Sequence, residues 1–317
     1  MGKKIYITES QLNEIIGNVV TDSSGFAKHM LAKQADKVKD SSIEKVKTWA
    51  VSRKIDGVRA SFYWKDGMIK SASRGGGDYD YSTSDFREHP KLIKFFESHP
   101  DWVLDGELYK HGKSLQQISG AARMEKVATG CDWIEYYVYD IMAPEVPFSE
   151  RLKMLETLAS ELSLGFNPER EWEKDELRIQ IIPQEIVCED NKKDQIMELH
   201  NQYVSEGWEG CVARDISKSY KFGGRGNEMI KFKMYQDAEF EITGISEGLR
   251  PEDMCFTLKT EDGIEFKAKP MGSRELKEQY REDLPNLIGK MATVKFFYLS
   301  DEGTPLQPVL KSIRDYE

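Results

Sequence analysis

The sequence lacks the long apolar stretches and leader patterns that mark several classes of protein. No segment approaches the roughly 20 consecutive apolar residues of a membrane-spanning helix. The first residues, MGKKIYITESQLNEII, do not have the basic and then apolar pattern of a secretion signal. We therefore expect a cytoplasmic protein that has no membrane partner.

Cysteine and histidine are both scarce. The four cysteines form no Cys-x-x-Cys pair, and the five histidines are scattered along the chain. This distribution argues against a disulfide framework and against a zinc site of familiar spacing. The chemistry of lysine, arginine and carboxylates remains. A catalytic metal would need oxygen ligands, which favours magnesium or manganese.

The chain also lacks an excess of positive charge. Its 45 basic and 55 acidic residues give a formal net charge of −10. Proteins that bind nucleic acids are usually basic, but a local basic groove can still hold phosphates, because fields decay within about 8–10 Å at ordinary salt. The net charge therefore argues mildly against a general nucleic-acid binder and does not exclude nucleic acid as a partner.

The 317 residues are enough for two domains, and a hydrophobic content of 39% is enough for a real core. The first 235 residues predict an α+β domain with antiparallel sheets. Asp-Gly pairs at 56–57 and 66–67 predict hairpin turns. Further strands are expected over 102–109, 134–142 and 179–187. Helices are expected over 11–20 (capped by Thr8 or Ser10), 90–100, 149–162 (capped by Ser149) and 192–207, and residues 27–48 are expected to run from helix into strand.

The pattern changes after about residue 237. Five short alternating strands and one helical stretch, SRELKEQYRE, follow within about 80 residues, which is typical of a small barrel of the OB type. We therefore expect an α+β domain over residues 1–235 and an OB-fold domain over residues 236–317.

Five charged clusters interrupt segments that would otherwise be plain strands. They are KIDGVR (54–59), SRGGG (73–77), DGELY (105–109), EGWEG (206–210) and KFK (231–233). Taken singly, each is explained as an exposed turn, a loop, a helix end or the polar face of a strand, since most lysines are exposed. A functional interpretation therefore depends on the clusters acting together.

Nucleophilic attack by a lysine side chain is one function that the clusters could perform together. At its ordinary pKa of about 10.4 almost none of a lysine is neutral, but burial and neighbouring cations lower that pKa. Strand alternation places Lys231 and Lys233 on one face. If that face meets Lys54, we expect it to lower the pKa of Lys54 and to neutralise a phosphate. A metal held by Glu209 or Glu107 would add to both effects. This pattern favours attack on a nucleotide phosphorus, with a phosphoramide product.

In their order along the chain, the clusters resemble the motifs of the covalent nucleotidyltransferase superfamily, which includes ATP-dependent DNA ligases, RNA ligases and mRNA capping enzymes. The Lys-x-Asp-Gly-x-Arg motif is matched by Lys54, Asp56, Gly57 and Arg59. The later motifs are matched by Ser73-Arg74-Gly75, Asp105-Gly106-Glu107, Tyr139-Asp140, Glu209-Gly210 with Val212 and Arg214, and Lys231 with Lys233.

Within this superfamily the chain is most similar to ATP-dependent DNA ligases of the small phage-type or bacterial form. The segment YKFGGRGNEMIKFK (220–233) and the tail segments DAEFEITGI and PVLKSIRDYE carry this similarity. The resemblance implies that Lys54 attacks the α-phosphate of ATP, that the AMP passes to the 5′-phosphate of a nick in duplex DNA, and that the 3′-hydroxyl then displaces AMP. It also implies that residues 1–235 form the adenylation (nucleotidyltransferase) domain and that the protein is a monomer.

The same resemblance implies roles for the matched side chains. Asp56 belongs to the catalytic motif of Lys54. Arg59 and Glu107 would hold the ribose and its surroundings, Arg74 the AMP or the nick's 5′-phosphate, and Tyr139 would stack on adenine. Glu209, with Glu107, would bind Mg²⁺ or Mn²⁺, Lys231 and Lys233 would grip the α-phosphate, and Arg314 would orient the leaving pyrophosphate.

Two positions depart from the family pattern. Ser52 occupies the position of a glutamate that reads the adenine amino group in many members, and the end of the chain reads Arg314-Asp315-Tyr316-Glu317 in place of Arg-x-Asp-Lys. Only 53 residues precede Lys54, too few for the separate DNA-binding domain of larger ligases. We therefore expect a minimal enzyme.

Three alternatives stay open at this point. An RNA ligase of the same superfamily would seal RNA ends, although the OB-like tail argues against many of these. A capping enzyme would use GTP. A non-catalytic nucleic-acid-binding module would explain the OB part, but it would not explain why lysines and carboxylates recur at strand ends.

Overall fold

The computed structural model describes residues 28–79, 81–124, 131–233, 235–247, 254–297, 299–300 and 302–314. The helix expected over 11–20, its cap at Thr8 or Ser10, and residues 315–317 lie outside these ranges. The chain divides into two compact units, Met1–Phe232 and Lys233–Glu317. The boundary expected between residues 235 and 236 lies close to this division and stays a prediction.

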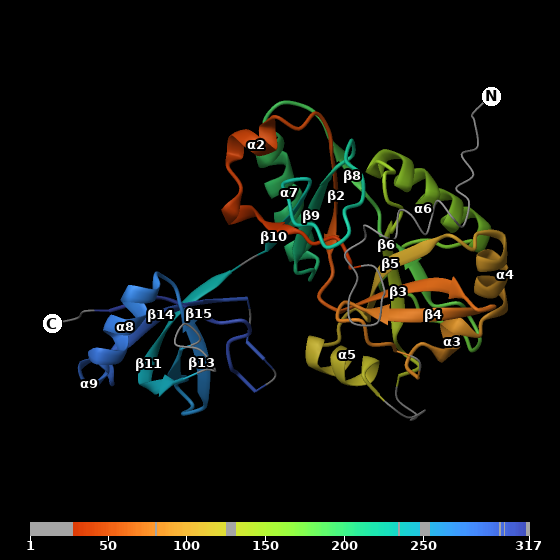
Figure 1. Cartoon of the computed structure of the whole chain (residues 1–317). Coiled ribbons are helices and arrows are strands. Elements are labelled where there is room, and N and C mark those ends of the chain that lie inside the picture. The colour runs from red at the N-terminus through yellow and green to blue at the C-terminus, as the bar shows by residue number, and fades with distance from the viewer. Residues whose placement is uncertain are drawn as a thin grey trace. The chain divides into compact units, whose positions relative to one another are not determined.

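The first unit contains two five-stranded sheets, so it is a mixed α+β unit (Figure 1). One sheet has the order β1-β10-β9-β2-β8, with bounds Lys33–Gln34, Met229–Lys233, Gly210–Asp215, Trp49–Lys54 and Glu185–Val187. The other has the order β4-β3-β5-β6-β7, with bounds Met68–Ser73, Val58–Lys65, Val103–Tyr109, Glu135–Ile141 and Ile179–Ile181. The pairs β2/β8, β2/β9, β3/β4, β3/β5 and β5/β6 are antiparallel, whereas β1/β10 and β6/β7 are parallel.

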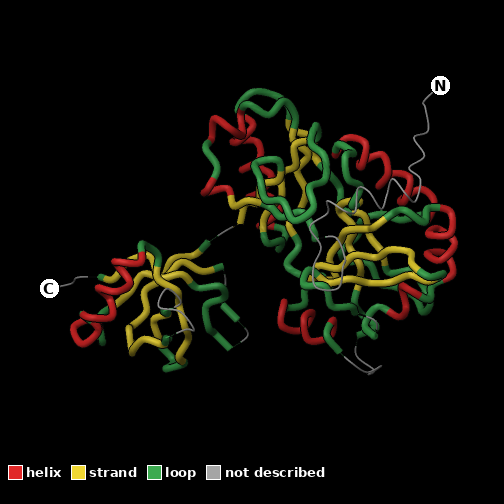
Figure 2. The backbone as a smooth tube through the Cα atoms, viewed as in Figure 1, coloured by secondary structure: helices red, strands yellow, loops and turns green. Residues whose placement is uncertain are grey.

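Helices cover these sheets (Figure 2). Their bounds are Ala35–Lys37 (η1, a 3-10 turn), Asp40–Glu44 (α2), Ser84–Arg87 (α3), Pro90–Ser98 (α4), Leu115–Ala122 (α5), Phe148–Leu162 (α6) and Lys192–Ser205 (α7). Helix α6 packs on β6, and α7 packs on β9 and β2. Buried rings such as Phe62 and Tyr136, whose centroids lie 4.4 Å apart, fill the space beneath them. Burial of such a side chain contributes about 1.5–3 kcal/mol.

The two Asp-Gly pairs behave differently. Asp66 and Gly67 have φ of 54° and 74° and join β3 to β4 in a hairpin, as predicted. The hairpin predicted at Asp56-Gly57 is wrong, because β2 and β3 belong to different sheets. A Cβ on Gly57 would lie 2.4 Å from the Leu108 carbonyl oxygen, so glycine is needed there for close passage between the sheets.

Three other local predictions need correction. The strand expected over 179–187 is split at Pro183 into β7 and β8, which join different sheets, since proline cannot donate to a sheet ladder. Ser149 lies inside α6, whose N-cap position is Pro147 without a side-chain cap. Described residues before 48 form strand β1 followed by η1 and α2, rather than a helix leading into a strand.

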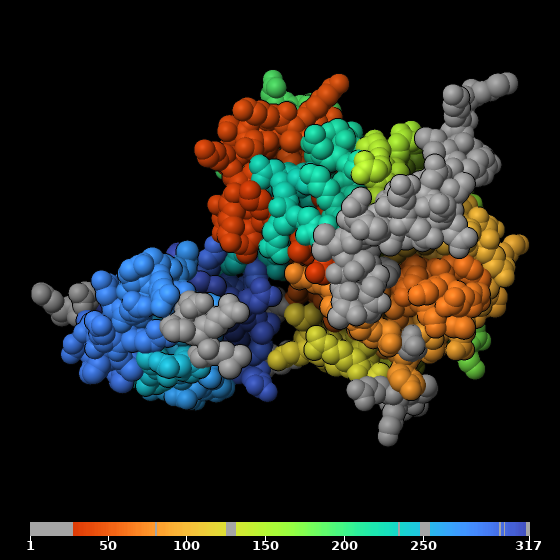
Figure 3. All heavy atoms as spheres, viewed as in Figure 1, coloured from red at the N-terminus to blue at the C-terminus, as the bar shows by residue number. Residues whose placement is uncertain are grey.

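The red segment near residues 30–50 and the teal segment near residues 210–230 lie against each other on the face in Figure 3. This neighbourhood agrees with the pairing of Lys33 with Ile230 and of Gln34 with Lys231. The beginning and the end of the first unit are therefore joined in one sheet, which brings Lys231 beside the segment that leads to β2.

The second unit is a closed five-stranded barrel with the order β11-β12-β13-β15-β14. Its strands span Gln236–Ser246, Cys255–Lys259, Glu265–Pro270, Met291–Phe296 (β14) and Val309–Ile313 (β15), and the helices Arg274–Glu282 (α8) and Leu284–Leu287 (α9) lie between β13 and β14. Strand β13 alternates exposed and buried residues, with Phe266 and Ala268 facing the core. Closure leaves no unpaired sheet edge. Among the described helices of the chain, none is long and apolar enough to cross a membrane.

Candidate active site

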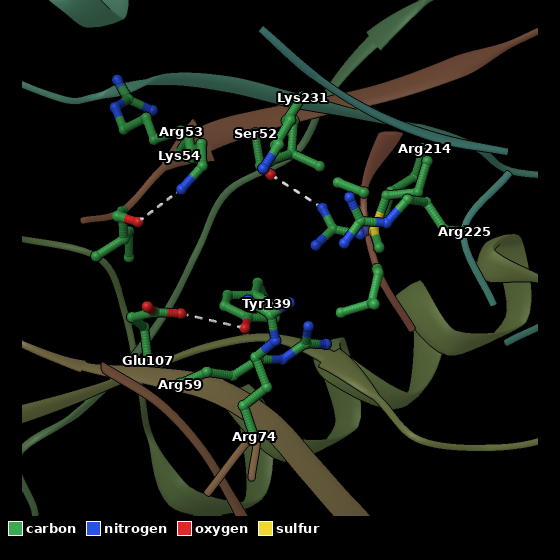
Figure 4. Close-up of a pocket in the computed structure, with 15 residues that line it drawn as sticks. Ser52, Arg53, Lys54, Arg59, Arg74, Glu107, Tyr139, Arg214, Arg225 and Lys231 are labelled. Atoms are coloured by element: carbon green, nitrogen blue, oxygen red, sulfur yellow. Dashed lines mark hydrogen bonds between the residues drawn. The ribbon is translucent and has the colours of Figure 1, made fainter. Parts of the chain in front are cut away.

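A pocket lies within the first unit where the two sheets face each other (Figure 4). Strand β2 contributes Ser52, Arg53 and Lys54, and its sheet neighbours β9 and β10 contribute Val212, Arg214, Met229 and Lys231. The opposite sheet contributes Arg59, Glu107 and Tyr139, and the connecting segments contribute Leu31, Ala32, Ile55, Arg74 and Arg225. The Asp56-Gly57 crossing therefore places Lys54 and Arg59 on opposite walls of one pocket.

Lys54 is the last residue of β2, and its ammonium group donates to the Glu209 carboxylate and to the Ile55 carbonyl at 3.2 Å. Glu209 is almost fully buried, with 4% of its side chain exposed. Burial lowers the pKa of Lys54, but the carboxylates of Glu209 and Glu107 outweigh burial, so the pKa is raised. The expectation that neighbouring cations lower this pKa is therefore wrong for this geometry.

Glu107 lies on β5 and faces the same end of the pocket. Its Oε2 accepts a hydrogen bond from the Tyr139 hydroxyl at 3.3 Å. Burial raises the pKa of Glu107 to about 7, and repulsion from Glu209 and Asp56 adds to this effect against the attraction of nearby cations. This end of the pocket therefore holds carboxylates close enough to repel one another.

Arg59 on β3 is held by a two-pronged ion pair with Asp105 on β5, the neighbouring strand of the same sheet. Its Nε and Nη2 donate to the two Asp105 oxygens at 2.9 and 2.5 Å, and its Nη1 donates to the Met30 carbonyl at 2.8 Å. Tyr220 donates to the same carboxylate at 2.8 Å. Although burial raises the pKa of Asp105, the Arg59 charge and hydrogen bonds lower it overall. Paired bonds of this kind fix the guanidinium in place.

Ser52 and Arg214 meet at another part of the pocket. Arg214 Nη1 donates to Ser52 Oγ at 3.1 Å, and the Arg214 guanidinium carbon lies 5.4 Å from the Tyr139 ring centroid. Both residues are buried, with exposed fractions of 1% and 5%. The sequence motif contains Arg214 but assigns it no role, and Arg225 and Met229 lie in the ligase-like segment 220–233 with no role assigned to either. The alternation of Val212 and Arg214 on β9 is the signal that could have placed Arg214 on the pocket face.

The predicted residues fall into two groups. The pocket is lined by seven of them, namely Ser52, Lys54, Arg59, Arg74, Glu107, Tyr139 and Lys231. Glu209 contacts the pocket residue Lys54. The charge of Asp56 raises the pKa of both Lys54 and Glu107. Lys233 is the last residue of β10 and the first residue of the second unit, to which Arg314 also belongs. There the Lys233 ammonium lies 3.8 Å from the Phe297 ring centroid, and Arg314 donates to Glu239 at 2.7 Å. Their catalytic roles stay predictions.

The carboxylate end of the pocket fits a magnesium ion bound together with a nucleotide. The mutual repulsion of Glu107, Glu209 and Asp56 is the observation that favours a cation there. Within the described residues no group of three His, Cys, Asp or Glu side chains is arranged to hold a metal by itself. Mg²⁺ commonly takes only one or two carboxylates and completes its shell with phosphate oxygens and water.

Comparison with known proteins gives a consistent result. The family model described as "ATP dependent DNA ligase domain" matches residues 29–233. A DNA ligase of African swine fever virus is 26% identical over 298 residues, 89% of this chain and 67% of that protein. A DNA ligase of Archaeoglobus fulgidus is 25% identical over 217 residues, 64% of this chain and 35% of that protein.

Solved structures share the fold at lower sequence identity. A structure from a study of Lig E DNA ligases has a TM-score of 0.67 at 20% identity, covering 91% of this chain and all (100%) of that chain. The ATP-dependent DNA ligase of bacteriophage T7, in complex with ATP, has a TM-score of 0.51 at 18% identity, covering 90% of this chain and 98% of that chain. At these identities the likeness concerns the fold.

Proposed function

The chain belongs to the ATP-dependent DNA ligase family, and on that premise we propose that it seals nicks in duplex DNA through an AMP bound covalently to Lys54. The observation that carries this proposal is the position of Lys54 in a pocket that combines carboxylates, cations and an aromatic ring. The alternatives of an RNA ligase and a GTP-dependent capping enzyme are not favoured by the relatives, which are named DNA ligases.

In the first step the neutral Lys54 amine attacks the α-phosphorus of ATP. A nitrogen–phosphorus bond forms, the bond from the α-phosphorus to the bridging oxygen breaks, and pyrophosphate leaves. The ion pair stabilises the ammonium form, so Lys54 must first lose one proton to solvent before its amine can attack. As the nitrogen–phosphorus bond forms, the amine loses a second proton to the Glu209 carboxylate, which already accepts its hydrogen bond.

In the second step an oxygen of the nick's 5′-phosphate attacks the same phosphorus, and the nitrogen–phosphorus bond breaks. The Lys54 amine takes its proton back. In the third step the 3′-hydroxyl attacks the 5′-phosphate, and AMP leaves with the electrons of the broken phosphoanhydride bond. Lys54 acts as a temporary carrier of AMP, so a single pocket serves the first two steps.

The other side chains would bind and orient the reactants. The Tyr139 ring offers a flat face for the adenine, and Arg59, fixed by Asp105, and Glu107 would hold the ribose side. Lys231 on β10 would neutralise the α-phosphate. Arg74 at the end of β4 would contact the AMP or the 5′-phosphate.

Glu209 and Glu107 would hold a divalent cation. When bound, such a cation would neutralise phosphate charge and compete with Lys54 for the Glu209 carboxylate. Among the ligand chemistries available here, carboxylate oxygens suit Mg²⁺ and Mn²⁺.

We further propose that the barrel is an OB fold that contributes to the grip on nicked DNA. Its strand order β11-β12-β13-β15-β14 and the position of α8 and α9 between β13 and β14 support this assignment. Arg314 would orient the leaving pyrophosphate in the first step, and Lys233 would join Lys231 at the α-phosphate. These two roles rest on the sequence motifs.

The proposal is tested by covalent labelling followed by sealing. Incubated with α-labelled ATP and magnesium, the protein should become labelled, whereas Lys54→Ala should stay at background. Nicked duplex DNA should then be sealed faster than matched RNA ends. Labelling retained in Lys54→Ala would remove Lys54 as the nucleophile, and faster sealing of RNA would favour the RNA ligase alternative.

A further inference from the structure

A cluster of aromatic rings encloses Trp208, the residue that precedes Glu209. Trp208 is buried, with 5% of its surface exposed. Its ring centroid lies 4.6 Å from that of His111 and 5.8 Å from those of Tyr109 and Phe166. Contacts with three rings hold the indole in one place, since each such pair adds to the stabilisation that burial provides.

Tyr109 places this cluster at the carboxylate end of the pocket. It is the last residue of β5 and lies two positions after Glu107, so both side chains face the same side of their sheet. Burial raises the pKa of Tyr109, and nearby carboxylates that include Asp56 and Glu209 add to this effect. The cluster therefore lies close to the charges that surround Lys54.

His111, two residues beyond the end of β5, packs against the connection between α7 and β9. Its Nδ1 lies 3.2 Å from the Tyr109 hydroxyl oxygen. A Cβ on Gly207 would lie 3.6 Å from the His111 Cε1, so the imidazole borders Gly207 as well as the Trp208 indole. The ring thus borders the two residues that lead into Glu209, while 19% of the His111 side chain stays exposed.

The main chain on both sides of this contact is also fixed. The Trp208 amide donates to the Tyr203 carbonyl at 3.0 Å, and the Glu209 amide donates to the Lys54 carbonyl at 3.2 Å. Because Trp208 and Glu209 are consecutive, a shift of the indole would displace the Glu209 backbone together with its carboxylate. The position of that carboxylate against Lys54 therefore depends on how the Trp208 ring is seated.

We propose that Trp208 is a positioning residue: clamped by the His111 and Tyr109 rings, it holds the Glu209 carboxylate against Lys54. Trp208 does not line the pocket, so it acts through Glu209. The inference rests on the proposed function, in which Glu209 takes a proton from Lys54 during attack on ATP. Misplacement of a reacting group by about 1 Å can cost about 100-fold in rate.

The first test is single-turnover labelling of Trp208→Leu with α-labelled ATP. The labelling rate constant at saturating ATP should fall about 10–100-fold, while the dissociation constant of ATP should change less than about threefold. Trp208→Phe keeps a ring in the cluster and should label within about threefold of the parent protein. A Trp208→Leu rate equal to that of the parent would overturn the inference.

Trp49→Leu is the matched control. It removes a fully buried indole from the first position of β2, at the opposite end of that strand from Lys54. Its loss of stability should be similar, but the labelling rate of the folded protein should not change. Equal rate losses in Trp49→Leu and Trp208→Leu would mean that general destabilisation, rather than positioning, causes the effect.

A double variant tests whether Trp208 acts through Glu209. In a Glu209→Gln background, Trp208→Leu should cause little further loss of labelling rate, because the carboxylate that the indole positions is already absent. Losses that multiply, as for independent sites, would contradict this route.

Acetylation of Lys54 by acetic anhydride reads the same geometry without ATP. Mass spectrometry gives its rate relative to the exposed Lys153. The ion pair with Glu209 holds Lys54 as an ammonium ion, so Trp208→Leu should speed acetylation at least about threefold, whereas Trp49→Leu should not. An unchanged rate in Trp208→Leu would overturn the inference.

These outcomes separate the inference from the ligase proposal. A parent protein that is never labelled by ATP contradicts the ligase proposal, and the acetylation rates still decide the role of Trp208. If Trp208→Leu does not fold, His111→Ala removes a stacking ring from a partly exposed position and should lower the labelling rate at least about threefold. An unchanged rate in His111→Ala would then overturn the inference.

Discussion

Lys54 and Glu209 form a direct ion pair although 155 positions separate them in the sequence. The amine that we propose as the nucleophile is thus stored as an ammonium ion, and its activation would consist of weakening this pair. The Glu209 carboxylate, which stabilises the resting Lys54 ammonium group, is also the group that we propose receives the Lys54 proton and binds a metal.

Glu209→Gln should lower the pKa of Lys54, because it removes the main charge that raises it. More of the amine is then neutral at a given pH, so the pH at which labelling by ATP reaches half its maximum should fall. A pH series of single-turnover labelling measures this shift. The maximal rate should also fall if Glu209 holds the metal, but an unmoved half-maximal pH would show that Glu209 does not control Lys54.

Glu107 gives a second prediction, on stability. The pKa of Glu107 is raised from 4.5 to about 7, so the folded protein binds this proton more tightly than the unfolded chain does. The stabilisation is present below pH 4.5 and is lost as pH rises through about 7. Relative to Glu107→Gln, the parent protein should lose on the order of 3 kcal/mol over this range. Urea unfolding at a series of pH values checks it, and parallel pH curves for the two proteins would contradict it.

The Arg59–Asp105 pair predicts a large effect of a small change. Asp105 is buried, with 1% of its side chain exposed, so Asp105→Asn leaves the Arg59 charge without its partner. We expect a loss of about 3–5 kcal/mol in the free energy of unfolding. The exposed Lys153–Glu150 pair is the control, and Glu150→Gln should change stability by about 0.5 kcal/mol or less. Similar losses in both variants would contradict a special role for the buried pair.

Gly57→Ala should disrupt both folding and labelling. The added methyl group would lie 2.4 Å from the Leu108 carbonyl oxygen and 2.8 Å from the Glu107 Cγ, so the crossing between the sheets would have to shift. We expect a destabilisation of about 1–3 kcal/mol and a loss of labelling. Gly120→Ala, in helix α5 with no atom within 4 Å of the new methyl, should be neutral or stabilising by up to about 1 kcal/mol. Thermal unfolding of both variants decides.

Secondary structure can be predicted from the sequence wherever a short segment determines its own conformation. The Asp66-Gly67 hairpin and helix α4 follow from local residues. The Asp56-Gly57 crossing does not, because the dipeptide specifies a turn and leaves open which strands pair across it. Pairing of β2 with β9, 160 or so residues later, is decided by packing of the whole unit.

In the candidate site, too, local motifs were predictable from the sequence, whereas contacts between distant segments were not. Motif spacing placed Lys54, Arg59 and Glu107 together correctly. The sequence predicts the wrong direction for the pKa of Lys54, because residue spacing does not rank Glu209 above Lys231 as the charge that acts most strongly on Lys54. Arg214 was in the motif, but its contact with Ser52 became visible only when β2 and β9 were seen side by side.

The pocket is lined by residues that lie far apart in the chain, between Leu31 and Lys231, so they are synthesised at different times. Lys54 is made early, whereas Glu209 and Lys231 come near the end of the first unit. A nascent chain that stops before β9 has Lys54 but neither Glu209 nor the β9 and β10 wall of the pocket. Under the proposed mechanism, attachment of the nucleotide would therefore require that synthesis has passed β10.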